Sequence, residues 1–210
     1  MPLDLEEQEH VDELKAWWSK HGALILAAVL AAILAFTVWA FWRKYEGGQA
    51  AQASVLYEAL AKAAQSGDAK ALRDAGGTLT ESHPRTLYAS MGALVAARFY
   101  FDRNDLKNAK AQLQWAIERA PSEDFRDLAR LRLGAILLDE KAYDEALKVG
   151  DTPHVAVYDA QFAALKGDVL VAKTQPAEAK AAYKLALDKA GKDDAAFRES
   201  VRVRLEALGG

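Results

Sequence analysis

Arginine and large aromatic residues that lie close together give this sequence its clearest capacity to recognise another protein. Trp, Tyr and Arg carry much of the binding energy at protein interfaces. The sequence offers such residues in the segments "RFYF" at 98–101, "LQWAIERA" at 113–120 and "LARLRLGAILL" at 128–138. We take five of them as candidate protein-binding residues: Arg98, Tyr100, Trp115, Arg130 and Arg132. For the aromatic residues, the composition of their segments favours a position in the core.

The residue types that catalysis or metal binding would need are scattered or missing. The four histidines, His10, His21, His83 and His154, do not pair with acidic residues at metal-ligand spacing, and the chain has no cysteine. No GxSxG, GxGxxG or phosphate-loop motif occurs, and Gly76-Gly77 is predicted to form a turn. His83 and His154 are predicted to lie at turns before helices. The sequence therefore predicts no enzyme, cofactor, metal or small-molecule substrate.

The charge of the chain is divided unevenly. Residues 1–21 contain six acidic and two basic residues, whereas the remaining residues contain 24 acidic and 25 basic ones. The long C-terminal part is thus close to neutral and lacks the basic surface that nucleic-acid binding requires. Its acidic residues are expected on solvated helix faces, next to Lys or Arg.

After residue 45, apolar residues recur with the period of a helix and strand patterns are rare. The predicted helices lie near 47–66, 68–80, 85–102, 105–119, 123–139, 142–149, 154–172, 176–190 and 193–208. An all-α domain over 46–210 follows from this pattern, with alternating helices and short turns.

Three of these helix pairs share one spacing of small residues. In the second helices, Ala109, Ala146 and Ala179 stand 37 and 33 residues apart. Twelve residues before each of them, the first helices carry a small residue: Ala97, Gly134 and Gly167. This is the spacing of the tetratricopeptide repeat, whose period is 34 residues. The chain is therefore predicted to form an α-solenoid with repeats near 90–121, 127–153 and 160–191.

The repeat pattern has a physical reason, and it weakens in the middle repeat. A small residue lets two helices cross at close range, while a large residue such as Leu113 or Tyr183 fills the space to the next repeat. At the matching position the middle repeat has Gly150, so we expect the solenoid to bend there. The segment 47–82 is expected to cap the array at one end, and the helix 193–208, with Asp193 or Asp194 as its N-cap, at the other.

The segment "GALILAAVLAAILAFTVWAFW", Gly22 to Trp42, contains no charged residue. Its 21 residues would form a helix of about 32 Å, which is long enough to cross the hydrocarbon core of a membrane. Trp17 and Trp18 before the segment, and Trp39 and Trp42 at its other end, fit the belts of aromatic residues at membrane interfaces. A buried core helix is the alternative. The segment before it, with Val11, Leu14 and Trp18 on one face, is either a helical extension or a short interfacial helix.

A cleavable signal peptide would need a basic start, a shorter apolar run and small residues at its end. Here the start is acidic, and the run ends in "AFWRKYEGG". We therefore predict an uncleaved membrane anchor. Its direction stays open, because Lys15 and Lys20 on one side balance Arg43 and Lys44 on the other.

An acidic N-terminal segment, one anchor and an atypical repeat domain follow one another in this chain. Four stretches mark the layout: "DELKAWWSKHG", "YASMGALVAARFYFDRNDLKNAKAQLQWAI", "LARLRLGAILLDEKAYDEALKVGD" and "LKGDVLVAKTQPAEAKAAY". In this order they resemble the YfgM family of bacterial inner-membrane proteins, described as ancillary subunits of the SecYEG translocon. The resemblance implies a cytoplasmic tail over 1–21, a transmembrane helix over 22–42 and a periplasmic domain over 46–210. It also implies partners: SecYEG and a periplasmic chaperone such as PpiD.

The leading hypothesis for function is a scaffold that brings periplasmic chaperones to the translocon. Two alternatives stay open. The acidic tail could bind a cytoplasmic partner and act in envelope regulation, or the repeat domain could serve another assembly, such as cytochrome maturation or cell division. All three are binding functions, because the sequence offers a surface and no reactive centre.

Overall fold

The computed structural model of this chain describes the backbone of residues 5–209 and the side chains of residues 13–209. Within these residues every regular element is a helix, which confirms the all-α prediction. The chain divides into two compact units, Met1–Gly48 and Gln49–Gly210, which are described separately. Helix α1 (Leu5–Ser66) contributes to both units.

In the first unit, α1 is the one described helix that is long and apolar enough to cross a membrane. Its side chains from 26 to 42 are all exposed, which argues against the alternative of a buried core helix for this segment. The hydroxyl of Thr37 donates to the carbonyl of Leu34 at 2.8 Å, which satisfies the hydroxyl inside the helix. A helix also satisfies its own backbone N–H and C=O groups, as a hydrocarbon environment requires.

At both ends of the apolar segment, Trp side chains contact nearby residues of the same helix. The ring of Trp18 lies over Gly22, where a Cβ atom would come within 3.0 Å of it. The guanidinium of Arg43 lies 5.3 Å from the ring centre of Trp39, and the indole N–H of Trp42 donates to Glu46 at 2.7 Å. Because α1 begins at Leu5, the residues before the apolar segment extend the same helix. The acidic side chains of Asp4 to Asp12 lie outside the described residues.

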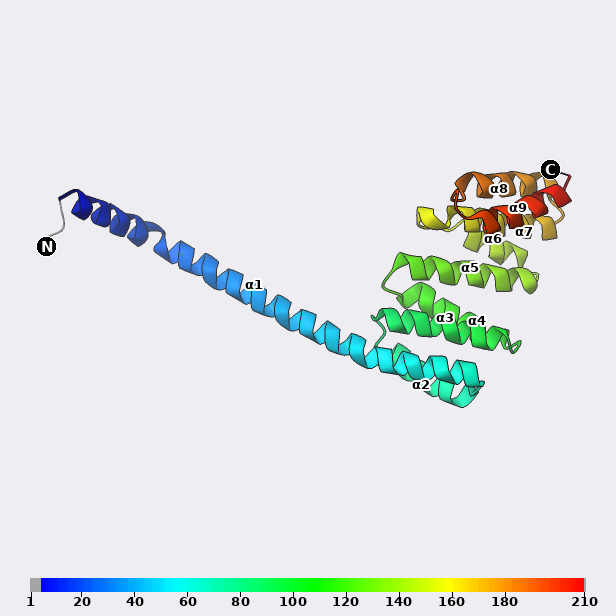
Figure 1. The fold of residues 1–210 in the computed structure, drawn as a ribbon, viewed down its shortest axis with the longest axis horizontal. Coiled ribbons are helices and arrows are strands. Elements are labelled where there is room, and N and C mark those ends of the chain that lie inside the picture. The colour runs from blue at the N-terminus through cyan, green and yellow to red at the C-terminus, as the bar shows by residue number, and fades with distance from the viewer. Residues whose placement is uncertain (1–4, 210) are drawn as a thin grey trace. The chain divides into compact units, whose positions relative to one another are not determined.

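The second unit contains the end of α1 and a series of short helices that stack in antiparallel pairs (Figure 1). These are α2 (Ala69–Ser82), α3 (Leu87–Phe101), α4 (Leu106–Arg119), α5 (Glu123–Asp139), α6 (Tyr143–Gly150), the short 3₁₀ helix η1 (Ala156–Tyr158), α7 (Asp159–Ala172), α8 (Pro176–Lys189) and α9 (Ala195–Ala207). Each helix from α2 to α9 packs against the next in chain order, and α5 also packs against α7.

The three predicted repeats share one turn between their helices. In each turn a residue adopts a positive φ near 60°, and these residues are Asn104, Lys141 and Thr174. The amide of the next residue then donates to the carbonyl five residues before it, in the bonds Asp105 to Tyr100, Ala142 to Leu137 and Gln175 to Leu170. These positions are 37 and 33 residues apart, as the small residues are. The three turns thus follow the same spacing as the small residues in the sequence.

Close helix crossings occur at two of the three predicted small residues, Gly134 and Gly167, and the opposing side chain comes from a different place in each. Gly167 faces the ring of Tyr183 in α8, the second helix of its own repeat. Gly134 instead faces Leu165 of α7, which comes 2.5 Å from the place of a Cβ atom. Gly150 at the end of α6 offers no large side chain. Leu165 from the following repeat therefore fills the space that Tyr183 fills in the third repeat.

The first hairpin, formed by the end of α1 and α2, corrects one prediction. Gly76 and Gly77 lie inside α2 rather than in a turn. The helix continues because Asp68 caps its start and because Leu72 and Leu79, one on each side of the glycines, are both buried. A Cβ atom on Gly76 would come within 3.2 Å of Leu60 in α1, so this glycine permits close packing of the hairpin.

At the other end of the second unit, α9 packs against α8. The carboxylate of Asp194 accepts a hydrogen bond from the amide of Phe197 at 3.2 Å, which makes Asp194 the N-cap. Val201 is fully buried, and Phe197 and Leu205 pack against the same core cluster. The guanidinium of Arg198 donates to the carbonyl of Leu187 at 2.7 Å, so α9 also satisfies a free carbonyl at the end of α8.

Candidate protein-binding groove

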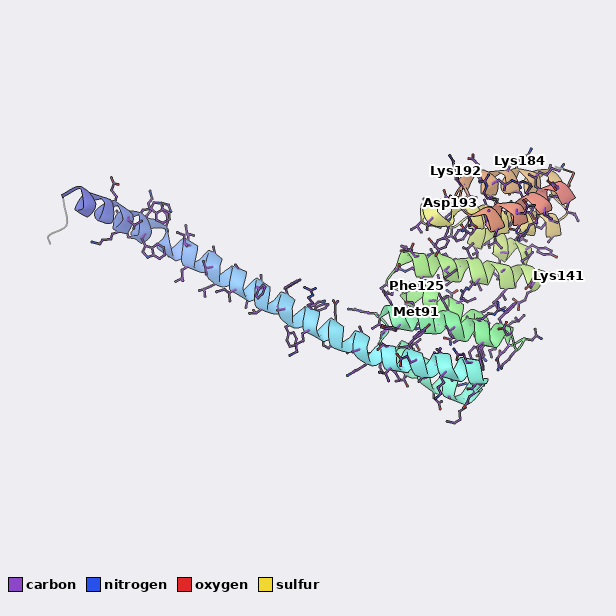
Figure 2. The ribbon with its side chains drawn as sticks, in the orientation of Figure 1. Met91, Phe125, Lys141, Lys184, Lys192 and Asp193 are labelled. Atoms are coloured by element: carbon purple, nitrogen blue, oxygen red, sulfur yellow. The ribbon has the colours of Figure 1, made fainter. Side chains whose placement is uncertain are left out.

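Helices α1, α3 and α5 form a groove in the second unit, which we call the α3–α5 groove. Its larger hollow has a volume of about 490 Å³. The residues that line it are Tyr57, Ala64, Gln65, Met91, Leu94, Val95, Arg98, Phe99, Asp102, Arg103, Phe125 and Arg132. Figure 2 shows Met91 of α3 and Phe125 of α5 on the same side of the stacked helices.

A smaller hollow of about 210 Å³ continues the groove between α3, α4 and α5. It is lined by Ala97, Arg98, Phe101, Leu113, Arg132, Ala135 and Ile136. Arg98 and Arg132 belong to both hollows, so these two side chains separate two apolar spaces. The structure thus brings together two of the five candidate residues that the sequence singled out.

Helical periodicity explains why α3 presents this surface. Met91, Leu94, Val95 and Arg98 recur at three- and four-residue steps, and so lie on one face of the helix. The opposite face buries small residues such as Ala93 and Ala96 in the core. From the first hairpin, Tyr57 reaches the groove and packs its ring 5.9 Å from that of Tyr88. The capping hairpin therefore contributes to the groove as well as closing the array.

The two groove arginines differ in their electrostatic surroundings. Both are exposed, but only Arg98 forms an ion pair among the described residues, with Asp102 at 2.8 Å, one turn further along α3. Arg132 donates to the carbonyl of Leu94 at 3.3 Å. Partial burial, and secondarily the charge of Arg98, lower the pKa of Arg132. A third guanidinium, that of Arg103, lies 3.6 Å from the ring centre of Phe99. The groove therefore combines apolar walls with an excess of positive charge.

The two aromatic candidates lie elsewhere. Tyr100 is buried in the core, with its ring edge-on to that of Phe99 at 5.7 Å. Trp115 is half-buried on α4 and packs against the same core cluster. Both positions agree with the core role that the composition of their segments favours, and neither residue lines the groove.

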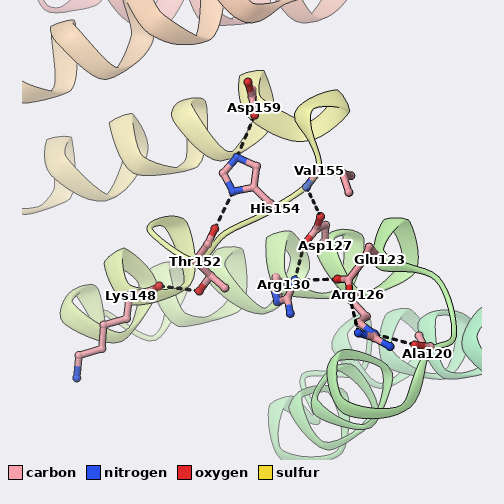
Figure 3. A network of polar contacts seen from close by, with 10 residues as sticks. All are labelled: Ala120, Glu123, Arg126, Asp127, Arg130, Lys148, Thr152, His154, Val155 and Asp159. Carbon is pink, nitrogen blue, oxygen red and sulfur yellow. Dashed lines mark hydrogen bonds and ion pairs between the residues drawn. The ribbon is translucent and has the colours of Figure 1, made fainter.

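Arg130 also lies outside the groove, and its guanidinium neutralises a buried carboxylate. Its guanidinium lies 2.5 Å from Asp127, whose side chain is completely buried, and 3.7 Å from Glu123. Asp127 thus departs from the expectation that acidic residues lie on solvated faces. Its second oxygen accepts a hydrogen bond from the amide of Val155 at 2.8 Å (Figure 3).

The same network fixes the segment that follows the short helix α6. The imidazole of His154 stacks on the ring of Phe162 at 4.0 Å. One of its nitrogens contacts the carbonyl of Thr152 at 2.8 Å, and the other lies 3.3 Å from Asp159 (Figure 3). Asp127 and His154 together hold the irregular connection between α6 and α7, where the repeat pattern weakens.

The other histidine of the second unit, His83, makes structural contacts. His83 lies in the turn between α2 and α3, as predicted, where its ring bonds to Gln49 and its amide caps α2. Among residues whose side chains are described, no three His, Asp or Glu side chains gather in a way that could hold a metal ion.

Sequence reasoning missed most of the apolar wall of the groove, including Tyr57, Met91 and Phe125. The three- and four-residue spacing of Met91, Val95 and Arg98 on α3 could have indicated the groove. However, the segment 87–101 is apolar on nearly all sides, so the sequence does not distinguish its core residues from its groove residues.

Comparisons with known proteins agree with this architecture. The family described as "Tetratricopeptide repeat-like domain" matches residues 15–210. A protein of Neisseria gonorrhoeae is 30% identical over 99% of this chain and 100% of its own length. Relatives from Haemophilus influenzae and Escherichia coli are 27% and 26% identical over 89% and 87% of this chain, and 91% and 88% of their own lengths.

All three relatives carry the name "Ancillary SecYEG translocon subunit". They are named for a complex of which they are a subunit and not for a reaction. The match extends over the apolar helix, the groove helices and the C-terminal cap. This chain therefore belongs to the YfgM family of ancillary SecYEG translocon subunits, with their tetratricopeptide repeat-like domain.

Proposed function

We propose that this chain is a membrane-anchored adaptor of the SecYEG translocon that binds periplasmic chaperones, such as PpiD, through its repeat domain. In this proposal residues 22–42 span the inner membrane. Residues 1–21 then lie in the cytoplasm and the domain 46–210 in the periplasm. The observation that carries the proposal is the pairing of an uncovered apolar helix with a grooved domain in one chain. The names of the relatives supply the complex.

The groove supports the binding role because its residues suit protein contacts. Apolar side chains such as Met91 and Phe125 bury area on binding, and Met adapts to differently shaped partners. Arg98 and Arg132 add charged donors beside them. A surface of this kind binds without carrying out a reaction.

The anchor gives such a surface its place of action. Two weak contacts held on one molecule bind far more strongly than either contact alone, because the second contact forms at high effective concentration. A domain held at the membrane beside the export channel would meet chaperones and emerging chains there. The location of the domain is therefore part of its function.

A topology assay tests the most basic element of the proposal. Two separate fusions would be made after residue 210. One carries a reporter enzyme that is active only in the periplasm, and the other carries a reporter enzyme that is active only in the cytoplasm. We expect activity of the first reporter and none of the second. The opposite result would reject the periplasmic location and the adaptor function together.

Copurification tests the roles of the anchor and the groove separately. Deletion of residues 1–45 should leave a folded helical domain, because the second unit has its own core, but this domain should no longer copurify with SecYEG. In the full chain, Val95→Asp should reduce the amount of chaperone that copurifies. Lys107→Asp, at an exposed position of α4, should leave that amount unchanged. Full association of the deleted form with SecYEG would show that the anchor has no such role.

A further inference from the structure

The two arginines of the groove occupy a position that suggests what kind of segment binds there. Arg98 and Arg132 line both hollows of the α3–α5 groove, with Met91, Val95 and Phe125 on one side of them. On the other side lie Phe101, Leu113 and Ile136. A chain bound along the groove would therefore contact the apolar residues of one hollow, then the two guanidinium groups, then the apolar residues of the other hollow.

The charges of the groove do not balance within the molecule. Arg98 is paired with Asp102. For Arg132, the described part of the chain supplies a backbone carbonyl, that of Leu94, and no carboxylate. Asp102 is the one acidic residue among the lining residues, against Arg98, Arg103 and Arg132. A cation that lies beside apolar walls and has no anion of its own gains from a ligand that brings one.

We infer that the α3–α5 groove binds a segment of a partner protein in which an acidic residue stands between apolar residues. The carboxylate pairs with Arg132, beside Arg98, and the flanking apolar side chains enter the two hollows. This inference rests on the proposed function, since it specifies what the adaptor recognises. Charge complementarity favours the acidic segment over neutral and basic ones, because each of these would leave Arg132 without an anion.

Peptide binding to the full-length protein in lipid nanodiscs tests the inference directly. The probes are three fluorescein-labelled peptides that carry leucines on both sides of a central Asp, Asn or Lys and are otherwise identical. Fluorescence anisotropy should show the tightest binding for the Asp peptide. Its affinity should fall as salt rises, because ionic screening weakens contacts between accessible charges.

Variants of Arg132 provide the matched controls. Arg132→Gln should weaken binding of the Asp peptide about tenfold and change binding of the Asn peptide little. Arg132→Lys should restore most of the lost affinity. Arg119→Gln, at an exposed site in the last turn of α4 and outside the groove, should have no effect. Equal binding of the three peptides, no response to Arg132→Gln, or no binding up to about 1 mM would each overturn the inference.

Photo-crosslinking in intact cells separates this inference from the proposed function. A photoreactive amino acid at Val95 would capture whatever occupies the groove, with the same group at Lys107 as the control. Absence of any protein captured specifically at Val95 would count against the binding function itself. Captured segments without an acidic residue beside the crosslink, or capture of a second copy of this chain, would reject the acidic segment alone. Acidic segments whose capture falls in Arg132→Gln would support it.

Discussion

The ring of Tyr183 in α8 packs directly on Gly167 in α7, and a methyl group on that glycine would overlap the ring. The hydroxyl of Tyr183 donates to Asp168 at 2.8 Å. Arg204 of α9 donates to the same carboxylate at 2.9 Å. A single aromatic residue thus joins both helices of the last repeat and, through Asp168, the capping helix.

Gly167→Ala should destabilise the repeat domain, because the new methyl group forces the ring of Tyr183 out of its position. Overpacking of this kind costs about 1–3 kcal/mol. We expect the free energy of unfolding, measured from urea denaturation of the full-length protein in detergent by far-ultraviolet circular dichroism, to fall by about 2 kcal/mol.

Gly77→Ala is the control for this substitution. No atom lies within 4 Å of the position of its Cβ atom, and Gly77 is inside α2. Alanine there should raise the stability by up to about 1 kcal/mol through helix propensity. An unchanged midpoint for Gly167→Ala would mean that the ring of Tyr183 moves without cost.

The contact between Gly167 and Tyr183 also shows how far sequence reasoning reaches in this fold. The spacing of small residues identified Gly134 and Gly167 as crossing points, and both are crossing points in the structure. It could not identify which helix supplies the opposing side chain. Because α6 ends at Gly150, the partner of Gly134 comes from the following repeat. That outcome depends on which large residue is near enough in space, and periodicity holds no such information.

Two further failures have the same origin in tertiary contacts. The pair Gly76-Gly77 is typical of turns, yet buried Leu72 and Leu79 hold the segment in a helix. Asp127 sits in a segment rich in charges, and its burial depends on the amide of Val155, which lies 28 residues away in an irregular connection. The apolar wall of the groove was equally hidden, since helix α3 is apolar on most of its surface.

Tyr183→Phe should change how stability depends on pH. Burial, and then the hydrogen bond to Asp168, raise the pKa of Tyr183. In the unfolded chain a tyrosine loses its proton near pH 10. Above about pH 10 the unfolded state therefore binds fewer protons than the folded state, and the contribution of the hydroxyl to stability declines as pH rises.

The expected result is a difference between two denaturation series. Below about pH 9 the wild type should be more stable than Tyr183→Phe by about 1 kcal/mol, the usual worth of a hydrogen bond. Above about pH 10 the advantage should shrink. Two curves that stay parallel up to about pH 11.5 would contradict a raised pKa for this residue.

Asp127→Asn should strongly destabilise the joint between α5 and the connection before α7. The substitution leaves the guanidinium of Arg130 without its close carboxylate, and removing one partner of a buried ion pair costs about 3–5 kcal/mol. The amide of Val155 should also lose protection in hydrogen exchange, because the acceptor of its hydrogen bond is changed. Asp124→Asn, at an exposed position nearby, serves as the control.

The double variant Asp127→Asn with Arg130→Gln distinguishes lost charge pairing from lost packing. It removes both buried charges, so it should recover part of the stability that Asp127→Asn loses. A double variant that is less stable than the single one would show that Arg130 stabilises the fold independently of Asp127.

Ser90→Ala should stabilise the domain, in contrast to the other substitutions. Ser90 lies in α3 and is completely buried, and among the described residues its hydroxyl has no hydrogen-bond partner. A buried polar group without a partner costs about 1–3 kcal/mol, and alanine is also the better helix former. We expect the free energy of unfolding in urea to rise by about 1 kcal/mol. Ser54→Ala is the matched control, because the exposed hydroxyl of Ser54 already donates to Ala51 at 2.8 Å, and removing it should change little. A lower midpoint for Ser90→Ala would show that this hydroxyl contributes to stability after all.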